Sequence, residues 1–295
     1  MNSTMPELLF TVVIPTYNYA GYISTAIDSV LDQTERSEII VIDDGSTDDT
    51  RNVVAKYADK VKYVFQENKG VSAARNHGSR IASNEYIVFL DSDDTLLPNA
   101  LSIMANAVAS QPNTDVFIAG RTSVRADGKI KTSTPKSLSN SNLVNFKALI
   151  RRKLGSVTLA AIKKSVFDTI SFPEILRNNE DIVFTAHALT RFKCGTIQEP
   201  IIRVNLHDDS LRHQVSTESL SLEIADILFS DRVLPNDYLK YKTEYSSRVL
   251  LSRFRALYLS GQRDKAKNAY HQAIKLFPKH IFLVSYLKKY LKLYL

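Results

Sequence analysis

Short apolar runs rich in β-branched residues alternate with helical patterns over the first 120 residues. The apolar runs predict strands at Phe10–Ile14, Ile39–Asp43, Val61–Phe65, Tyr86–Leu90 and Val116–Ala119. Between them, apolar side chains recur at helical spacing: Ile23, Ile27, Val30 and Leu31, then Val71, Ala74 and Ile81, then Leu101, Met104 and Val108. This alternation predicts an α/β fold with a doubly wound, mainly parallel sheet.

The second half of the chain is less regular. A polar stretch from Arg121 to Ser141, with Asp127-Gly128 and Pro135, predicts a hairpin or a mobile loop. Beyond it, the pattern predicts helices over 143–152 and 180–191, strands over 157–162 and 196–204, and helices from about residue 220 onward. We therefore expect an α/β domain over residues 1–215 and a helical C-terminal extension over residues 216–295.

The net charge of +7 is concentrated in the C-terminal extension. Residues 231–295 hold 14 Lys and Arg against 4 Asp and Glu, whereas the preceding 230 residues hold 24 against 27. A helix over 281–295 would separate lysines from apolar side chains: Lys288, Lys289 and Lys292 on one side, and Leu283, Leu287, Tyr290, Leu291 and Tyr294 opposite. Such a helix can lie on an anionic membrane surface, or its apolar face can pack on the main domain. No nucleic-acid recognition motif accompanies the charge, so no nucleic-acid partner is expected.

Features of cellular location are few. The single cysteine, Cys194, excludes an intrachain disulfide and a cysteine-based metal cluster, which favours a reducing compartment. The first residues lack the pattern of a signal peptide, and the apolar runs are shorter than the roughly 20 residues of a spanning helix. We expect a cytoplasmic protein, with peripheral attachment to the inner face of the plasma membrane as the further alternative.

Polar segments follow the predicted strands, where doubly wound sheets bind their ligands. Four segments qualify: Pro15-Thr16-Tyr17-Asn18, residues 43–50, residues 68–76 and Asp91-Ser92-Asp93-Asp94. The first strand is not followed by G-x-G-x-x-G, and no G-x-x-x-x-G-K is present. These absences argue against a dinucleotide oxidoreductase and a P-loop phosphotransferase.

The aspartates of these segments permit two interpretations each. Asp91 and Asp93, crowded at a strand end, would repel each other unless Mg²⁺ or Mn²⁺ lies between them, or they form a turn that caps the helix near Asn99. Asp43 and Asp44 can accept hydrogen bonds from a base or ribose, or belong to a turn with an N-cap at Thr47. Arg75 can reach a diphosphate or pair with a carboxylate.

Taken together, these segments resemble the inverting family 2 glycosyltransferases with the GT-A fold. The resemblance rests on four runs in order: Val12 to Asn18, Ile40 to Asp48, Gly70 with Ala74-Arg75-Asn76-x-Gly78, and Leu90-Asp91-Ser92-Asp93-Asp94. It covers roughly residues 8–215, and it implies a nucleotide-diphosphate-sugar donor.

The resemblance also implies roles for individual residues. Tyr17 and Asp44 would contact the nucleobase, with Pro15, Thr16 and Asp43 lining its pocket and Arg75 near the base and diphosphate. Asp91, Ser92 and Asp93 form the D-x-D segment, in which Asp93 binds the metal and Asp91 lies toward the ribose. Glu180 and Asp181 match the catalytic Glu-Asp pair, whose Asp is the base. His207, in a late Arg-x-x-x-His-x-x-Ser segment from Arg203, would meet the metal or diphosphate.

Simpler interpretations of the late residues remain open. Acidic residues such as Glu180 and Asp181 are favoured at a helix start, and His207 beside Asp208 can be a surface ion pair. The chemistry itself is consistent, because displacement at an anomeric carbon needs a base for the acceptor hydroxyl and a charge sink for the departing diphosphate.

The predicted function is therefore a hexosyltransferase that moves a sugar, with inversion, from a UDP-sugar to a hydroxyl of a saccharide or lipid-linked acceptor. Mn²⁺ or Mg²⁺ is the expected cofactor, and bacterial surface-polysaccharide synthesis is the expected setting. One alternative is a sugar nucleotidyltransferase, although the Gly-rich basic loop that it would need is absent from Thr16 to Ala20. The other is a catalytically silent partner that binds a sugar nucleotide.

Overall fold

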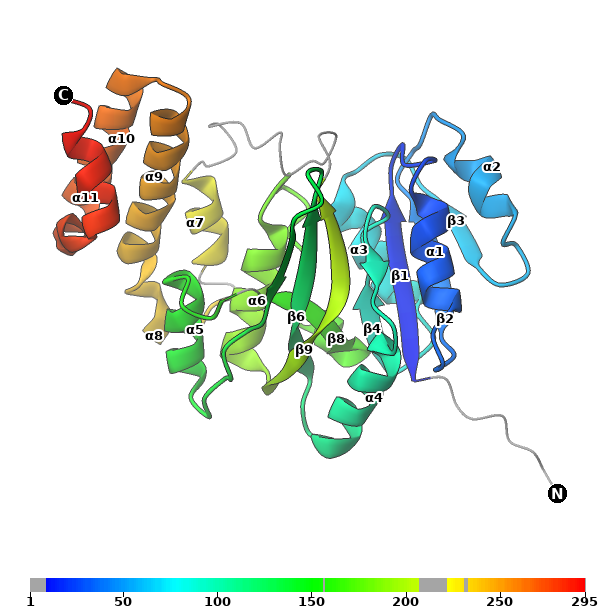
Figure 1. Ribbon diagram of the computed structural model, residues 1–295. Coiled ribbons are helices and arrows are strands. Elements are labelled where there is room, and N and C mark those ends of the chain that lie inside the picture. The colour runs from blue at the N-terminus through cyan, green and yellow to red at the C-terminus, as the bar shows by residue number, and fades with distance from the viewer. Residues whose placement is uncertain (1–8, 156, 207–221, 231–232, 295) are drawn as a thin grey trace. The chain divides into compact units, whose positions relative to one another are not determined.

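The computed structural model describes residues 9–155, 157–206, 222–230 and 233–294 (Figure 1). They form two compact units. The N-terminal unit comprises residues 1–146 and 152–208, and the C-terminal unit comprises residues 147–151 and 209–295. The boundary predicted at residue 215 lies within 207–221, outside the described residues.

One mixed β-sheet is the centre of the N-terminal unit, with strand order β3-β2-β1-β4-β8-β6-β9-β5 and β7 paired to β6. The strands are β1 Phe10–Thr16, β2 Glu38–Asp43, β3 Lys62–Phe65, β4 Tyr86–Phe89, β5 Thr95–Leu96, β6 Val116–Arg125, β7 Ile130–Ser133, β8 Thr158–Lys163 and β9 Cys194–Leu206. Strands β3, β2, β1 and β4 are parallel neighbours, and β6 is parallel to β9. Strands β8, β7 and β5 pair antiparallel with their neighbours. The α/β class predicted from the sequence is confirmed.

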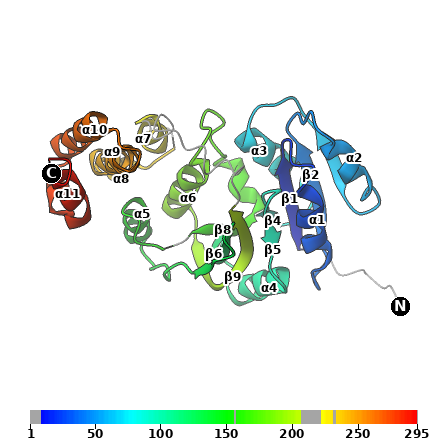
Figure 2. The same cartoon turned by 45° about the horizontal axis from the view of Figure 1, so that its top comes forward.

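Helices α1 and α4 cover one face of this sheet, and α3 and α6 cover the other (Figure 2). The helices in this part of the chain are α1 Ile23–Leu31, α2 Thr50–Ala55, α3 Val71–Ile81, α4 Ala100–Ser110, α5 Asn142–Ile150, the 3₁₀ helix η1 Lys164–Asp168 and α6 Glu180–Arg191. Because side chains alternate along a strand, Val12 and Ile14 of β1 enter the core with α1 and α4, whereas Val13 faces α3. Helix α3 approaches β1 so closely that a Cβ at Gly78 would lie 2.3 Å from Val13 Cγ1.

Two segments left open by the sequence are settled by the structure. Of the two alternatives for the polar stretch after Arg121, the hairpin is the observed one: β6 pairs with β7, and the turn between them has Gly128 at φ +76°. The helix after the Asp-Gly-Ser-Thr segment begins at Thr50, whose N–H donates to Asp48 Oδ1 at 3.1 Å. Thr47 is therefore not its N-cap.

The C-terminal unit is helical. Its helices are α7 Glu223–Leu228, α8 Asn236–Leu239, α9 Lys242–Leu259, α10 Arg263–Leu276, the 3₁₀ helix η2 Pro278–Phe282 and α11 Val284–Leu291. Its core joins buried side chains of α9 and α10, including Phe254, Tyr270 and Ala273. None of the helices in the described ranges is long and apolar enough to cross a bilayer.

Part of the apolar face predicted at the end of the chain packs within the C-terminal unit. The single helix predicted over 281–295 is divided into η2 and α11. Leu283, Leu287 and Tyr290 pack against the core of α9 and α10, within the C-terminal unit itself. Leu291, which was expected on the same face, is instead 55% exposed.

Candidate active site

The ends of β1 and β2 form one side of the candidate site. Thr16 and Asp43 are register partners at the end of the two parallel strands, and the N–H of Asp44 donates to the carbonyl of Thr16 at 2.9 Å. The following loops are joined by Asn18, which has a positive φ of 56°. Its side-chain oxygen accepts the N–H of Thr47 at 2.7 Å. This side of the site is thus a hydrogen-bonded pair of loops.

Two adjacent aspartates, the last residue of β2 and the one after it, are buried and support these loops. Asp43 accepts the N–H of Ser46 at 2.7 Å and the hydroxyl of Tyr63 at 2.6 Å. Burial, followed by the hydrogen bond to Asp43, raises the pKa of Tyr63. Asp44 accepts the N–H groups of Lys69 and Gly70 and the side-chain amide of Gln66; the three distances are 2.9, 2.7 and 2.7 Å. Asp44 thereby holds the segment that leads into α3.

The predicted nucleobase pocket is otherwise made by β1 residues. Pro15 and Thr16 are buried, and Tyr17, directly after the strand, is 44% exposed. An exposed aromatic ring above a buried strand end is available for stacking on a base. The carboxylates of Asp43 and Asp44 are committed to the loops described above, so their direct contact with a nucleobase stays a prediction.

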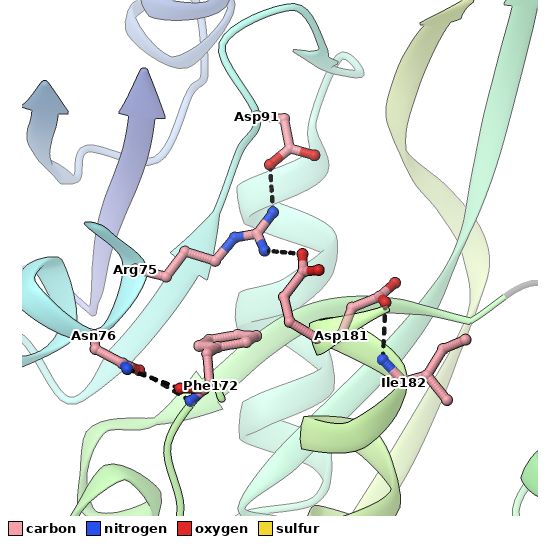
Figure 3. Close-up of polar contacts among 7 residues, drawn as sticks. Arg75, Asn76, Asp91, Phe172, Asp181 and Ile182 are labelled. Atoms are coloured by element: carbon pink, nitrogen blue, oxygen red, sulfur yellow. Dashed lines mark hydrogen bonds and ion pairs between the residues drawn. The ribbon is translucent and has the colours of Figure 1, made fainter. Parts of the chain in front are cut away.

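Arg75 links two segments that are far apart in the sequence. Its guanidinium donates from Nη2 to Asp91 Oδ1 and from Nη1 to Glu180 Oε1, each at 2.6 Å (Figure 3). It also lies over the ring of Phe172, 5.4 Å from the centroid. Burial opposes the charge of Arg75, but the two carboxylates outweigh it and raise its pKa. Arg75 therefore stays charged and joins the D-x-D segment to the start of α6.

The two acidic residues at the start of α6, Glu180 and Asp181, have different environments. Glu180 is 9% exposed and directed to Arg75. Burial raises the pKa of Glu180, the charge of Arg75 opposes that shift, and Asp181 adds to it. Asp181 is exposed, and its Oδ1 accepts the N–H of Ile182 at 2.8 Å (Figure 3). Of the two, only Asp181 is placed where an acceptor hydroxyl could reach it.

The D-x-D segment follows β4. Ser92 is buried, Asp91 is held by Arg75, and Asp93 is half-buried. Asn205 of β9 fixes the segment from the other side, donating from its side chain to the carbonyl of Asp93 at 2.8 Å and from its N–H to Asp94 Oδ1 at 3.1 Å. The backbone that carries Asp93 is therefore held at both ends.

The described residues offer a divalent cation one carboxylate, that of Asp93, and no complete set of protein ligands. Within the described ranges, no group of three or more His, Cys, Asp or Glu side chains could hold a metal. Mg²⁺ and Mn²⁺ at nucleotide sites need only one or two carboxylates together with substrate phosphates, and Asp93 supplies one. His207, the second predicted ligand, lies outside the described residues.

Three residues of the site were not assigned a role from the sequence. Asn76 of α3 exchanges hydrogen bonds with the backbone of Phe172, both at 2.9 Å. Asn205 holds Asp93 as described. The third is Arg177, whose Nη1 would lie 3.1 Å from a Cβ at Gly70, at the start of α3. Asn76 and Asn205 lie inside motif segments, which was a usable signal, whereas nothing in the sequence distinguishes Arg177.

Arg203 lies beside a different concavity. A groove of about 540 Å³ is lined by α1, β5 and β9, with Asp28, Asp32 and Arg203 among its side chains. It includes none of the residues predicted to bind the donor or the metal.

Three curated relatives share parts of this sequence. An uncharacterized glycosyltransferase of Rickettsia typhi is 40% identical over 111 residues, 37% of this chain and 35% of the relative. A GalNAc(5)-diNAcBac-PP-undecaprenol β-1,3-glucosyltransferase of Campylobacter jejuni is 33% identical, over 60% of this chain and 58% of its own. The poly(ribitol-phosphate) β-N-acetylglucosaminyltransferase TarP of Staphylococcus aureus is 34% identical, over 64% and 59%. The chain thus spans less than two thirds of each of these relatives.

Solved structures show the same fold. TarS 1–349 of S. aureus in complex with UDP-GlcNAc has a TM-score of 0.66 and 21% identity, over 97% of this chain and 89% of that one. A mannosyltransferase of Pyrobaculum calidifontis in complex with GDP-Man and Mn²⁺ has a TM-score of 0.58 and 17% identity, over 94% and 76%. The predicted GT-A-like fold with a helical C-terminal extension is confirmed.

A family model covers the part of the site that precedes α6. The model of glycosyl transferase family 2 matches residues 11–171, more than half of the chain, and includes the ends of β1, β2 and β4 with the loops that Asn18, Asp44 and Arg75 hold together. Its match agrees with the family resemblance found from the four sequence runs. The chain belongs to glycosyl transferase family 2.

Proposed function

We propose that this protein transfers a hexose from a nucleotide-diphosphate sugar to an acceptor hydroxyl with inversion. The observation that carries the proposal is the Arg75 bridge, which brings the D-x-D segment and the acidic start of α6 to one place. A donor held at the first segment would present its anomeric carbon toward the second. Family membership and the named transferases among the relatives support the same chemistry.

The proposed donor is a UDP-sugar. TarS structures contain UDP and UDP-GlcNAc, and the exposed ring of Tyr17 beside the buried end of β1 suits a planar base. The proposed acceptor is a saccharide or lipid-linked saccharide of bacterial surface-polysaccharide synthesis. This choice of acceptor is supported by the relatives, one of which is named for acting on an undecaprenyl diphosphate-linked glycan.

Each acidic residue has a separate task in the proposed reaction. Asp181 accepts the proton of the acceptor hydroxyl as its oxygen attacks the anomeric carbon from the face opposite the departing diphosphate. Glu180 does not touch substrate; it positions α6 through Arg75. Asp93, with His207, would hold Mn²⁺ or Mg²⁺, which when bound neutralises charge on the leaving nucleoside diphosphate.

The test uses two acidic residues that differ by one position. Asp181→Asn should keep donor affinity and lower turnover roughly a hundredfold or more, because a general base acts in the transition state. Glu180→Gln should lower thermal stability along with activity, because it removes the buried partner of Arg75. If the Asp181→Asn variant retains turnover but loses donor affinity, Asp181 is not the general base.

The donor and the activity can be tested before an acceptor is known. Nucleotide sugars are screened for thermal stabilisation with and without Mn²⁺. Slow hydrolysis of the stabilising donor distinguishes an enzyme from a silent binding partner, and the anomeric configuration of the product reports inversion. Stabilisation by UDP-sugars without any hydrolysis or transfer would favour the silent partner.

We also propose a location at the inner face of the plasma membrane, attached peripherally. A lipid-linked acceptor would be presented there, and the C-terminal unit carries the excess of basic residues.

A further inference from the structure

The C-terminal unit exposes a group of apolar side chains at η2 and α11. We name this group and its neighbouring lysines the basic apolar tip: Ile281, Phe282, Val284 and Leu291, with Lys279, Lys288 and Lys292. Phe282 is 80% exposed, Val284 58% and Leu291 55%. Single exposed apolar residues are ordinary on protein surfaces, but large ones gathered at one place mark an interaction site.

Packing within the C-terminal unit cannot cover the tip. Leu283, Leu287 and Tyr290 recur at helical spacing and are already packed on α9 and α10. Val284, Lys288 and Leu291 have the same spacing, displaced by one residue, so they form a neighbouring stripe turned about 100° around the helix. Figure 1 shows α11 beside the other helices of the C-terminal unit. The first stripe packs on the core of α9 and α10, whereas Val284 and Leu291 of the second stripe are exposed.

The charge around the tip has one sign. Residues 265–295 include seven lysines and no aspartate or glutamate. In the part of the chain that the structure describes, no ion pair joins Lys279, Lys288 or Lys292 to a carboxylate, and each of the three is exposed. Their charges are thus available to an external anionic partner.

We propose that the basic apolar tip docks on an anionic lipid bilayer. Its apolar side chains would enter the boundary between headgroups and acyl chains, while the lysines remain at headgroup level. A protein partner would be expected to match lysines with discrete acidic groups, whereas a headgroup layer accepts any arrangement of them. The inference takes the peripheral location proposed above as its starting point, but it requires no sugar transfer. Of the apolar face predicted by the sequence, only Leu291 belongs to the tip; Ile281, Phe282 and Val284 are new.

Point variants test the proposal better than truncation, because removing α11 would uncover the core of α9 and α10. The full chain is sedimented with vesicles of phosphatidylcholine containing phosphatidylglycerol, and with phosphatidylcholine alone. Phe282→Ser should weaken partitioning onto the anionic vesicles about tenfold, because the ring no longer leaves water. The control is Leu259→Ser, since Leu259 is 69% exposed in the same unit but outside the tip.

A second set of variants tests the contribution of the lysines to vesicle binding. Each lysine near an anionic leaflet contributes about a fivefold gain in partitioning, so Lys288→Gln with Lys292→Gln should lose about 25-fold and reduce the salt dependence. Lys56→Gln with Lys60→Gln, two exposed lysines of the N-terminal unit, is the matched control. Circular dichroism and the unfolding temperature verify that each variant is folded.

Three results would overturn the proposal. The tip variants could bind anionic vesicles as tightly as their controls, the native chain could bind neutral vesicles equally well, or the tip could mediate self-association in solution without any vesicle binding. Donor hydrolysis is measured on the same preparations. If the protein binds vesicles through the tip but never turns over a donor, the proposed reaction is refuted, whereas the proposed docking on lipid stands.

Discussion

Removal of Arg75 is the most informative perturbation of the site. The residue is 8% exposed and pairs with two carboxylates, which lie 16 and 105 positions after it in the sequence. The variant Arg75→Leu keeps much of the aliphatic bulk but leaves Glu180 buried without its cation. Asp91 is less affected, because a third of its side chain is exposed and water can replace the arginine.

The expected loss of stability follows from this asymmetry. Breaking a buried ion pair by removing one partner costs about 3–5 kcal/mol, most of it from the stranded charge, whereas an exposed pair contributes about 0–1 kcal/mol. We therefore expect Arg75→Leu to lower the free energy of unfolding by about 3–5 kcal/mol, chiefly through Glu180. Adding Glu180→Gln removes the stranded charge and should restore about 1–3 kcal/mol.

The same reasoning predicts a pH dependence of the loss. Burial raises the pKa of Glu180, and removing Arg75 takes away the charge that most opposes that shift. A carboxyl whose folded-state pKa is raised gains stability on protonation, so the penalty of Arg75→Leu should shrink as the pH falls from about 7 to about 5. With Glu180→Gln present, the penalty should no longer change with pH through this group.

Urea unfolding of the native chain, the single variants and the double variant at both pH values measures all of these quantities. The reasoning is refuted if Arg75→Leu costs less than about 1 kcal/mol, or if Glu180→Gln fails to restore stability in its background.

Three further predictions concern the metal ligand, the packing of α3 and the acid stability of the C-terminal unit. Asp93→Asn should weaken Mn²⁺-dependent UDP binding and nearly abolish transfer; unchanged Mn²⁺ dependence in titrations would exclude Asp93 from the metal site. Gly78→Ala should cost about 1–3 kcal/mol in urea unfolding, because its Cβ would meet Val13, whereas Gly21→Ala, with nothing within 4 Å, should change little. His280 is 3% exposed and burial lowers its pKa to about 4, so protonation in the unfolded chain removes up to about 3 kcal/mol as the pH falls from about 6.5 toward 4. The destabilisation by His280→Leu should therefore be smaller at about pH 5 than at about pH 7, and an equal value at both would contradict it.

Long periodic segments were predictable because their burial follows a local pattern. The strands at Phe10, Ile39 and Tyr86 begin within one residue of their expected positions, as does the helix from Glu180. Strand β5 was not predictable, because its two residues exist as a strand only through pairing with β9, more than 100 positions later. Helix α2 is only six residues long and lies where turn residues dominate the sequence.

For the site, the sequence identified the residue types at the strand ends but not their partners. Asp43 and Asp44 were expected at a ligand pocket, and the structure shows that their carboxylates hold the surrounding loops. The sequence left open whether Arg75 contacts a diphosphate or a carboxylate, and in the structure it pairs with two carboxylates. These outcomes depend on segments that meet only in the folded chain.

The sequence by itself determined the α/β class, the family, the polar strand ends and the basic character of the C-terminal residues, because each is written in local order and composition. Only the tertiary structure decided that Glu180 is buried while its neighbour Asp181 is exposed, and that Leu287 enters a core while Phe282 reaches solvent. Burial depends on everything that packs around a side chain, so two adjacent residues of similar chemistry can have opposite environments that no local pattern distinguishes.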